Sequence, residues 1–124
     1  MLALVAEDKF AAVFAPGSRA EVPIVGRLER PGRAPLEVSG QIDRLIATDA
    51  NVLIADYKTN QTPPRQLAEV PAAYLRQLAL YRAVLAKLYP GRPVRAVLVW
   101  TEAPEMMEIP AEILDREMAR IISP

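Results

Sequence analysis

Two apolar runs, each with an aspartate inside it, are separated by only a few polar residues. The first run lies within residues 36–48 and the second is residues 52–58, with Asp49-Ala50-Asn51 between them. Apolar, partly β-branched segments of this length, joined by a short polar turn, predict a β-hairpin. We expect this hairpin to form the centre of a mixed sheet.

The remaining segments predict helices and strands around the hairpin. The apolar positions Tyr74, Leu78, Tyr81, Leu85 and Leu88 repeat at helical spacing after Pro71, which suits the first position of a helix. Residues 94–100 are almost all apolar, as in a strand covered on both faces. The other expected elements are an amphipathic helix (2–14), an edge strand containing Pro23 (22–28), a turn-rich connection (29–35), a short strand (107–110) and a terminal helix (111–121).

The composition excludes several kinds of chemistry. The 124 residues suffice for one domain, and Lys plus Arg equals Asp plus Glu at 15 each. The absence of cysteine and histidine excludes thiolate nucleophiles, Ser-His-Asp triads and imidazole metal ligands. No apolar stretch is long enough to span a membrane and no phosphate-binding loop motif is present. We therefore expect a cytoplasmic protein whose chemistry uses carboxylates, lysine and hard metal ions.

Asp56 and Lys58 alternate along the second strand of the hairpin, so their side chains lie on one face about 6–7 Å apart. Taken alone, such a pair fits an ordinary ion pair with solvated heads. Asp43, on the first strand, adds a second carboxylate that one lysine cannot neutralise. Oxygen ligands without His or Cys favour Mg²⁺, with Mn²⁺ as a substitute.

This metal-site hypothesis depends on the register of the hairpin. A three-residue turn over 49–51 would place Asp43 opposite Tyr57 and therefore on the wrong face for Asp56. A two-residue turn at Asp49-Ala50, or a β-bulge, would put the two aspartates side by side. We predict the second arrangement.

Several phrases of the sequence resemble a known family. G-x-I-D-R-L, then L-I-x-D-Y-K-T-N after a turn, and later Y-x-x-Q-L-x-x-Y are similar to the PD-(D/E)xK nuclease superfamily. More narrowly, these motifs resemble the nuclease domain of the AddA and RecB helicase-nucleases, from about Phe10 to Trp100. Four phrases are most similar to AddA: SRAEVPIVGRL, SGQIDRLI, VLIADYKTN and YLRQLALYR. The resemblance implies an α/β, restriction-endonuclease-like mixed β-sheet with a central hairpin, flanked by helices.

The resemblance also implies roles for individual residues. Asp43 and Asp56 match the metal-binding acids, and the backbone carbonyl of Tyr57 matches a further ligand. Lys58 matches the lysine that orients or activates the attacking water. Glu21 resembles the family's upstream metal-binding acid, although a solvated acid ahead of a strand is an equal alternative.

The helix after Pro71 carries a further family motif. Gln77 and Tyr81, four residues apart on one helix face, match a motif that supports the site and the DNA strand. Without the resemblance, Tyr81 would be assigned to the core and Gln77 to the surface. Some of six basic residues could contact phosphates, although solvated side chains are the simpler interpretation: Arg65, Arg76, Arg82, Lys87, Arg92 and Arg95.

The implied function is Mg²⁺-dependent cleavage of DNA during resection of double-strand breaks for recombinational repair. The family places an ATP-driven helicase motor in the same polypeptide and an AddB-type subunit beside it, so ATP would bind only in that motor. Residues 1–124 are then expected to be a single nuclease domain, a C-terminal fragment without the motor or the upstream histidine-bearing helix. Alone, it is expected to bind Mg²⁺ weakly and cleave poorly. The alternative is a catalytically inactive relative that serves as a DNA-binding or subunit-docking module.

Overall fold

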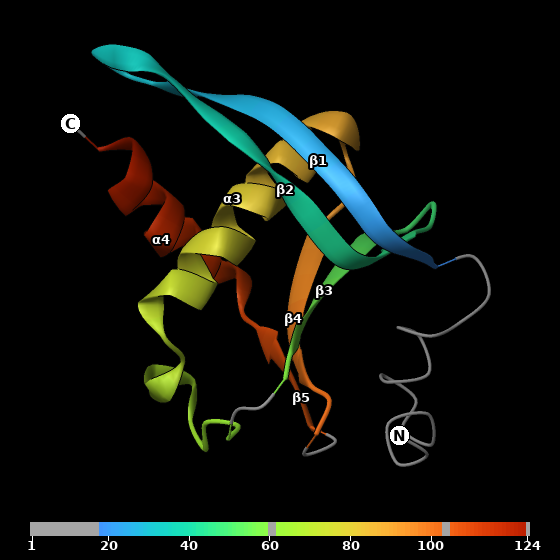
Figure 1. Ribbon diagram of the computed structural model, residues 1–124. Helices are drawn as coiled ribbons and strands as arrows, with labels where there is room; N and C mark the ends of the chain where they lie inside the picture. Colours follow the sequence, from blue (N-terminus) through green and yellow to red (C-terminus); the bar gives the residue numbers. More distant parts are fainter. Residues whose placement is uncertain (1–17, 60–61, 103–104, 124) are drawn as a thin grey trace.

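The computed structural model describes residues 18–59, 62–102 and 105–123 (Figure 1). The helix expected over residues 2–14 lies outside the described residues. The described elements are β1 (Arg19–Arg30), β2 (Arg33–Ala47), β3 (Val52–Lys58), the 3₁₀ turn η1 (Leu67–Glu69), α3 (Ala72–Leu88), β4 (Val94–Trp100), β5 (Glu105–Ile109) and α4 (Ala111–Ile122). None of the described helices is long and apolar enough to cross a membrane.

The five strands form one mixed sheet in the order β1-β2-β3-β4-β5. The β3–β4 pair is parallel, and the other neighbouring pairs are antiparallel. α3 provides the crossover that parallel neighbours require. The predicted fold class, a restriction-endonuclease-like mixed sheet with a central hairpin and flanking helices, is therefore confirmed.

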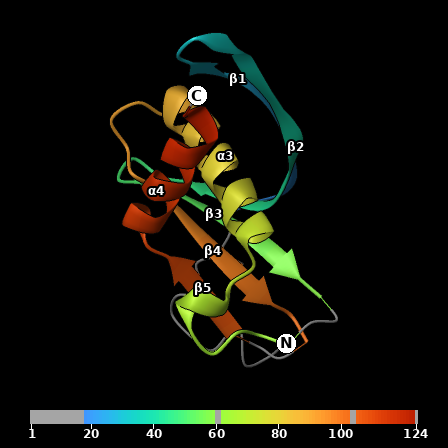
Figure 2. The ribbon, with the colours of Figure 1, turned by 90° about the vertical axis from the view of Figure 1, so that its left-hand side faces the viewer.

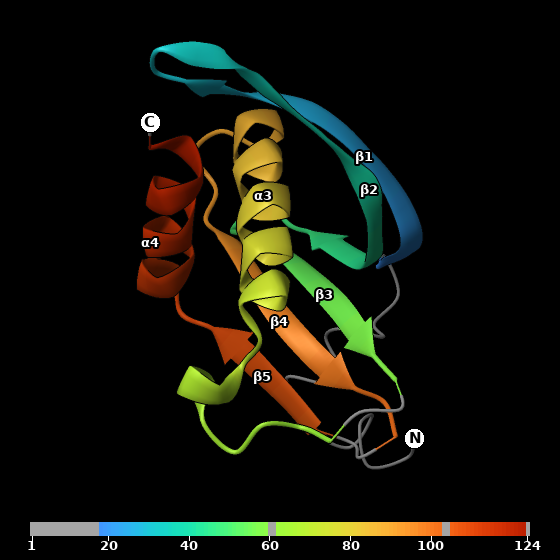
Figure 3. The ribbon, with the colours of Figure 1, turned by 60° about the vertical axis from the view of Figure 1, so that its left-hand side comes forward.

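The first two strands are longer than the sequence predicted. Residues 29–35, expected as a turn-rich connection, are mostly strand, because Gly32 with its positive φ of 71° closes a tight turn next to Pro31. β1 is an edge strand, so Pro23 is tolerated within it, as predicted. Only the last few residues of β2 pair with β3, and the rest of the β1–β2 hairpin arches over α3 (Figure 3). We call residues 22–42 of this hairpin the β-arm.

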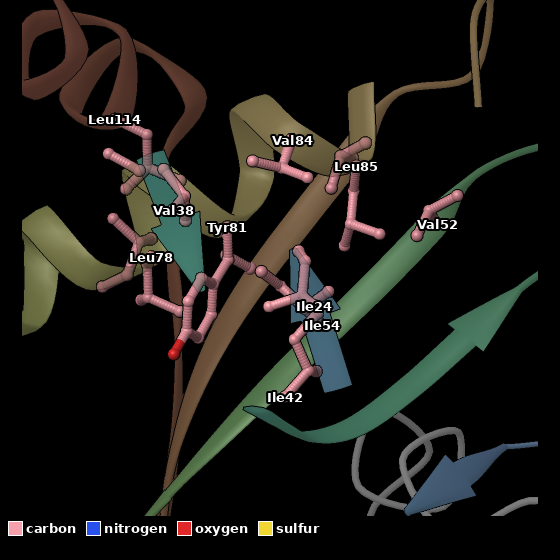
Figure 4. Close-up of a cluster of buried hydrophobic side chains, with 14 of the residues drawn as sticks. Ile24, Val38, Ile42, Val52, Ile54, Leu78, Tyr81, Val84, Leu85 and Leu114 are labelled. Carbon is pink, nitrogen blue, oxygen red and sulfur yellow. The ribbon is translucent and has the colours of Figure 1, made fainter. Parts of the chain in front are cut away.

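Both helices lie on the same face of the sheet, and the main core lies between them, the sheet and the β-arm (Figure 2). Figure 4 shows this core, in which Leu78 and Tyr81 of α3 pack among residues of three strands. Glycine allows the close approach of the β-arm to α3. A Cβ atom at Gly26 would overlap Val84, and one at Gly40 would overlap Tyr81.

The other face of the sheet carries a second, smaller apolar cluster. Ala55 of β3 and Val97 and Val99 of β4 are buried there. Because Ile54 and Leu98 are buried in the main core, β3 and β4 are apolar on both faces. The seven-residue apolar run therefore forms the strand covered on both faces that its sequence predicted.

Candidate active site

The hairpin turn sets the register of the candidate site. Thr48 donates a backbone hydrogen bond of 2.8 Å to the carbonyl of Asn51, which leaves Asp49 and Ala50 as the two turn residues. Arg44 of β2 accordingly pairs with Ala55 of β3. The next positions outward are Asp43 and Asp56, so the predicted two-residue turn is confirmed.

Near Asp43, the β2 strand switches which of its two faces is buried. Along the β-arm the buried residues of β2 are Val38 and Ile42, whereas beyond the arm the buried residue is Leu45. Asp43 lies where this alternation shifts. The shift falls opposite Glu21, whose φ of 53° is in the left-handed region that non-glycine residues seldom adopt. A local bend of the sheet therefore places Asp43 at the base of the arm.

Asp43 makes a direct contact with the neighbouring strand. The paired positions of β2 and β3 end at Arg44 and Ala55, so the backbone N–H of Tyr57 lies beyond them. Oδ2 of Asp43 accepts a hydrogen bond of 2.8 Å from that N–H. The side chain thus replaces a backbone acceptor where the two strands diverge, and this holds its carboxylate against β3.

Asp56 and Lys58 form a shielded ion pair on the helix-facing side of β3. Their Oδ2 and Nζ atoms are 2.7 Å apart, and each side chain is 13% exposed. Burial raises the pKa of Asp56 above the ordinary aspartate value; a hydrogen-bonding contact with Asp43 raises it further, and Lys58 opposes both effects. The structure therefore brings Asp43, Asp56 and Lys58 together, as the sequence predicted.

The arrangement of oxygens suits a divalent cation. Asp43 adds a second carboxylate next to the pair of Asp56 and Lys58, and within the described residues the buried Oδ2 of Asp56 has no hydrogen bond of good geometry despite its closeness to Lys58. A hard cation such as Mg²⁺ binds such oxygens and would relieve the repulsion between the two acids. Within the described residues, however, no three His, Cys, Asp or Glu side chains gather into a single cluster. Asp43 and Asp56 are therefore the two carboxylates that fit the ion.

Glu21 lies beside the aspartates but does not complete such a cluster. It is exposed, and together with Asp43 and Tyr57 it lines a pocket of about 300 Å³ at the base of the β-arm. Its neighbours Ala20 and Val22 pair with Arg44 and Ile42, which leaves Glu21 opposite Asp43 in the register. Its assignment as a metal ligand stays a prediction.

Tyr74 belongs to the site, although we did not single it out from the sequence. Nζ of Lys58 lies 3.9 Å from the centroid of the Tyr74 ring, which is a cation–π contact. Tyr74 sits in the first turn of α3, on the face that packs toward β3. Its place at the start of Y-x-x-Q-L-x-x-Y was the available signal, but helical spacing alone assigned it to the core.

Gln77 and Tyr81 lie one and two turns further along α3. Nε2 of Gln77 is 3.4 Å from the hydroxyl of Tyr81, a long hydrogen bond within the predicted motif. Tyr81 is buried in the core, while Gln77 is half-buried. Both line a pocket of about 370 Å³ between α3 and the β-arm, and Arg76 lies at the same pocket.

Most of the basic residues considered for phosphate binding have partners within the protein. Arg82 donates to the carbonyl of Val94 and pairs with Asp115, and Arg95 forms two hydrogen bonds with Glu108. Lys87 and Arg92 each donate to a backbone carbonyl. In the described part of the chain, Arg65 and Arg76 make no such contact. Of the six basic residues considered, these two are therefore available to bind a ligand.

Comparisons with known proteins identify the family and the fold. No curated protein matches the chain. A solved structure titled "Crystal structure of SSO0001" shares the fold, with a TM-score of 0.52 and 16% identity over 84% of this chain. The chain spans about half (49%) of the length of that structure's chain. The model of the PD-(D/E)XK nuclease superfamily matches residues 4–120, and the chain belongs to that superfamily.

Proposed function

We propose that this chain is a Mg²⁺-dependent DNA nuclease domain that hydrolyses phosphodiester bonds. Membership of a nuclease superfamily supports a nuclease-type function and DNA as the substrate. The observation that carries the proposal is that Asp56 lies 2.7 Å from Nζ of Lys58 and is also close enough to Asp43 for that carboxylate to raise its pKa. Two acids and a lysine on neighbouring strands, with Asp43 lining the pocket at the base of the β-arm, are the groups that metal-assisted hydrolysis requires.

Each residue has a distinct task in this proposal. Asp43 and Asp56 hold the ion, with the carbonyl of Tyr57 and the carboxylate of Glu21 as further ligands. When bound, Mg²⁺ supplies a polarised phosphoryl oxygen and a water of lowered pKa. Lys58 directs its ammonium group at the attacked phosphate and stabilises the negative charge that develops there. Gln77 and Tyr81 support the site and contact the DNA strand from α3.

We further propose that the domain acts as the nuclease of an AddA-type helicase-nuclease in resection of double-strand breaks. This part rests on the resemblance of SGQIDRLI, VLIADYKTN and YLRQLALYR to AddA. It implies an ATP-driven motor in the same polypeptide and an AddB-type partner subunit. A test is co-purification of the natural full-length protein with its partner from the source cell, followed by an assay of ATP-dependent degradation of DNA ends.

The nuclease proposal is tested by incubating linear DNA and Mg²⁺ with the natural full-length protein, because residues 1–124 alone are expected to cleave poorly. Asp56→Ala and Lys58→Ala should each lower cleavage by at least about 100-fold, because each removes a group that acts on the reacting phosphate or its ion. Asp49→Ala is the matched control, since Asp49 is an exposed acid in the turn of the same hairpin. Asp49→Ala should cleave at the wild-type rate. Chelation of Mg²⁺ should stop cleavage by both the wild type and Asp49→Ala.

The same experiment distinguishes the alternative function. A catalytically inactive DNA-binding or docking module would show no cleavage that depends on Asp56 or Lys58, but would retain DNA binding in all the variants. Binding of a fluorescent duplex, measured by anisotropy in Ca²⁺, separates the two cases. Equal cleavage by the wild type and both variants would contradict the proposed roles.

A further inference from the structure

We propose that Tyr74 is a positioning residue that holds the ammonium group of Lys58 at the reacting phosphate. The proposal rests on the proposed nuclease function. It gives a role to Tyr74, which begins the Y-x-x-Q-L-x-x-Y motif and to which the family resemblance assigned none. It is carried by the 3.9 Å distance between Nζ and the centre of the Tyr74 ring.

Lys58 is the last residue of β3, and a lysine at a strand end has a long and flexible side chain. Two contacts restrict it here. The carboxylate of Asp56 lies 2.7 Å from Nζ, and the face of the Tyr74 ring lies against the same ammonium group. Because the Lys58 side chain is only 13% exposed, the two contacts define where its charge sits.

An aromatic ring suits this task better than a third carboxylate. A ring face attracts the ammonium group through its quadrupole but carries no net charge. Asp56 already pairs with Lys58, and Asp43 adds a second negative charge next to Asp56, so another acid would neutralise the charge that the phosphate needs. The ring restricts Nζ and leaves its full positive charge and its other N–H groups available for substrate.

The position of Tyr74 in the fold also fits. It lies in the first turn of α3, which packs over the sheet, and its ring is only partly buried against the core. A purely structural role would require the ring for packing alone, so any apolar side chain of similar size would serve. A positioning role requires an aromatic face, and the two roles therefore predict different variants to be active.

The test compares Tyr74→Phe, Tyr74→Leu and a matched control, Tyr89→Leu. Tyr89 caps the same helix and forms a cation–π contact with Arg92 at 4.9 Å, but it lies about 22 Å further along the axis. The first readout is metal-free NMR of the Lys58 methylene protons next to Nζ. We expect an upfield ring-current shift in the wild type, in Tyr74→Phe and in Tyr89→Leu, and its loss in Tyr74→Leu.

The second readout is steady-state cleavage of linear DNA in Mg²⁺. Tyr74→Leu should lower kcat about 3- to 30-fold with little change in KM, while Tyr74→Phe and Tyr89→Leu stay near the wild-type value. If Tyr74→Leu does not fold, Tyr74→Met gives the same comparison. Wild-type kcat in a folded Tyr74→Leu or Tyr74→Met variant, or no ring-current shift in the wild type, would overturn the proposal. Cleavage is assayed in the natural full-length protein with its partner, because residues 1–124 alone are expected to cleave poorly. An inactive full-length wild type with a normal shift would overturn the nuclease function, and with it the catalytic purpose of the contact.

Discussion

The carboxylate of Asp43 accepts a hydrogen bond of 2.8 Å from the backbone N–H of Tyr57 on the neighbouring strand. The contact forms where β2 leaves β3 to enter the β-arm, just beyond the last paired residues, Arg44 and Ala55. The same carboxylate also raises the pKa of Asp56, to which it lies opposite in the register. Asp43 therefore joins two strands and contributes charge to the candidate site, and substitutions can separate these two tasks.

Asp43→Asn should keep the hydrogen bond that joins the two strands but remove the negative charge at the candidate site. The amide oxygen can still accept from the N–H of Tyr57, so the free energy of unfolding should change little, while Mg²⁺-dependent cleavage is lost. Asp43→Ala should lose both, with a cost of about 1–3 kcal/mol for a poorly solvated donor left without its acceptor. Urea denaturation and cleavage assays on the two variants check this. Equal stability of the two would contradict the structural task.

The raised pKa of Asp56 predicts how pH affects stability. Between the ordinary aspartate value of about 3.9 and its higher folded value, the folded protein binds more protons than the unfolded chain. In the absence of metal, the contribution of Asp56 to stability therefore decreases as pH rises through that window. Urea denaturation of the wild type in chelator, at several pH values from about 4 upward, measures the free energy of unfolding across this window. The control is Asp49→Asn, a substitution of an exposed aspartate, which should reproduce the wild-type profile.

Mg²⁺ should restore the stability that is lost as pH rises, because it binds the charged form of Asp56. The increase in melting temperature on adding Mg²⁺ should be small near the lower end of the window and largest above the folded pKa. At 100 times the dissociation constant the stabilisation would be about 2.7 kcal/mol. Asp56→Asn should abolish the increase at every pH, and an increase that persists unchanged in acid would contradict the ion's assignment to this pair.

The sequence predicted the parts of the fold that depend on local pattern. The apolar run ending at Trp100 predicted a strand, because such a pattern acts over a few residues. Turn length alone left two registers open, and the turn at Asp49-Ala50 was predicted because only its register brings Asp43 and Asp56 together. The same pattern could not show that residues 29–35 continue the strands around Gly32. That outcome depends on α3 giving the β-arm a surface to pack on, which is a tertiary effect.

The site was predictable where neighbouring residues of one hairpin create it, as for Asp43, Asp56 and Lys58. Contacts between distant elements were not. Helical spacing placed Tyr74 on the core face of its helix, but it did not say that Lys58 would lie under the ring. In the same way, charge alone did not distinguish Arg82, which links α3 to β4 and α4, from Arg76, which has no ion-pair partner among the described residues.

Arg33 connects the tip of the β-arm to the end of α4 by hydrogen bonds. Its guanidinium donates to the carbonyls of Ile121 and Ser123, at 3.2 and 2.5 Å, where a helix C-terminus also attracts positive charge. Arg33→Ala should therefore lower the free energy of unfolding by about 1 kcal/mol and speed hydrogen exchange of the amides in the arm. Arg30→Ala is the control, because the hydrogen bond that Arg30 donates among residues 18–59, 62–102 and 105–123 goes to the carbonyl of Ala34, within the arm itself. Identical exchange in both variants would show that Arg33 does not restrain the arm.

Gly40 and Tyr81 should behave as a coupled pair, because a Cβ atom at position 40 would lie 2.0 Å from the Tyr81 hydroxyl oxygen and 2.9 Å from its ring. Gly40→Ala should therefore lower the free energy of unfolding by about 1–3 kcal/mol through overpacking, although alanine suits a strand better than glycine. In a Tyr81→Phe background the worst overlap is removed, so the same substitution should cost less. A double-mutant cycle by urea denaturation measures this coupling, with the exposed Ser39→Ala as the neighbouring control. Additive costs would show that β2 moves away from α3 without strain, and that the glycine in the G-x-I-D-R-L phrase is not required by the tyrosine of the helix.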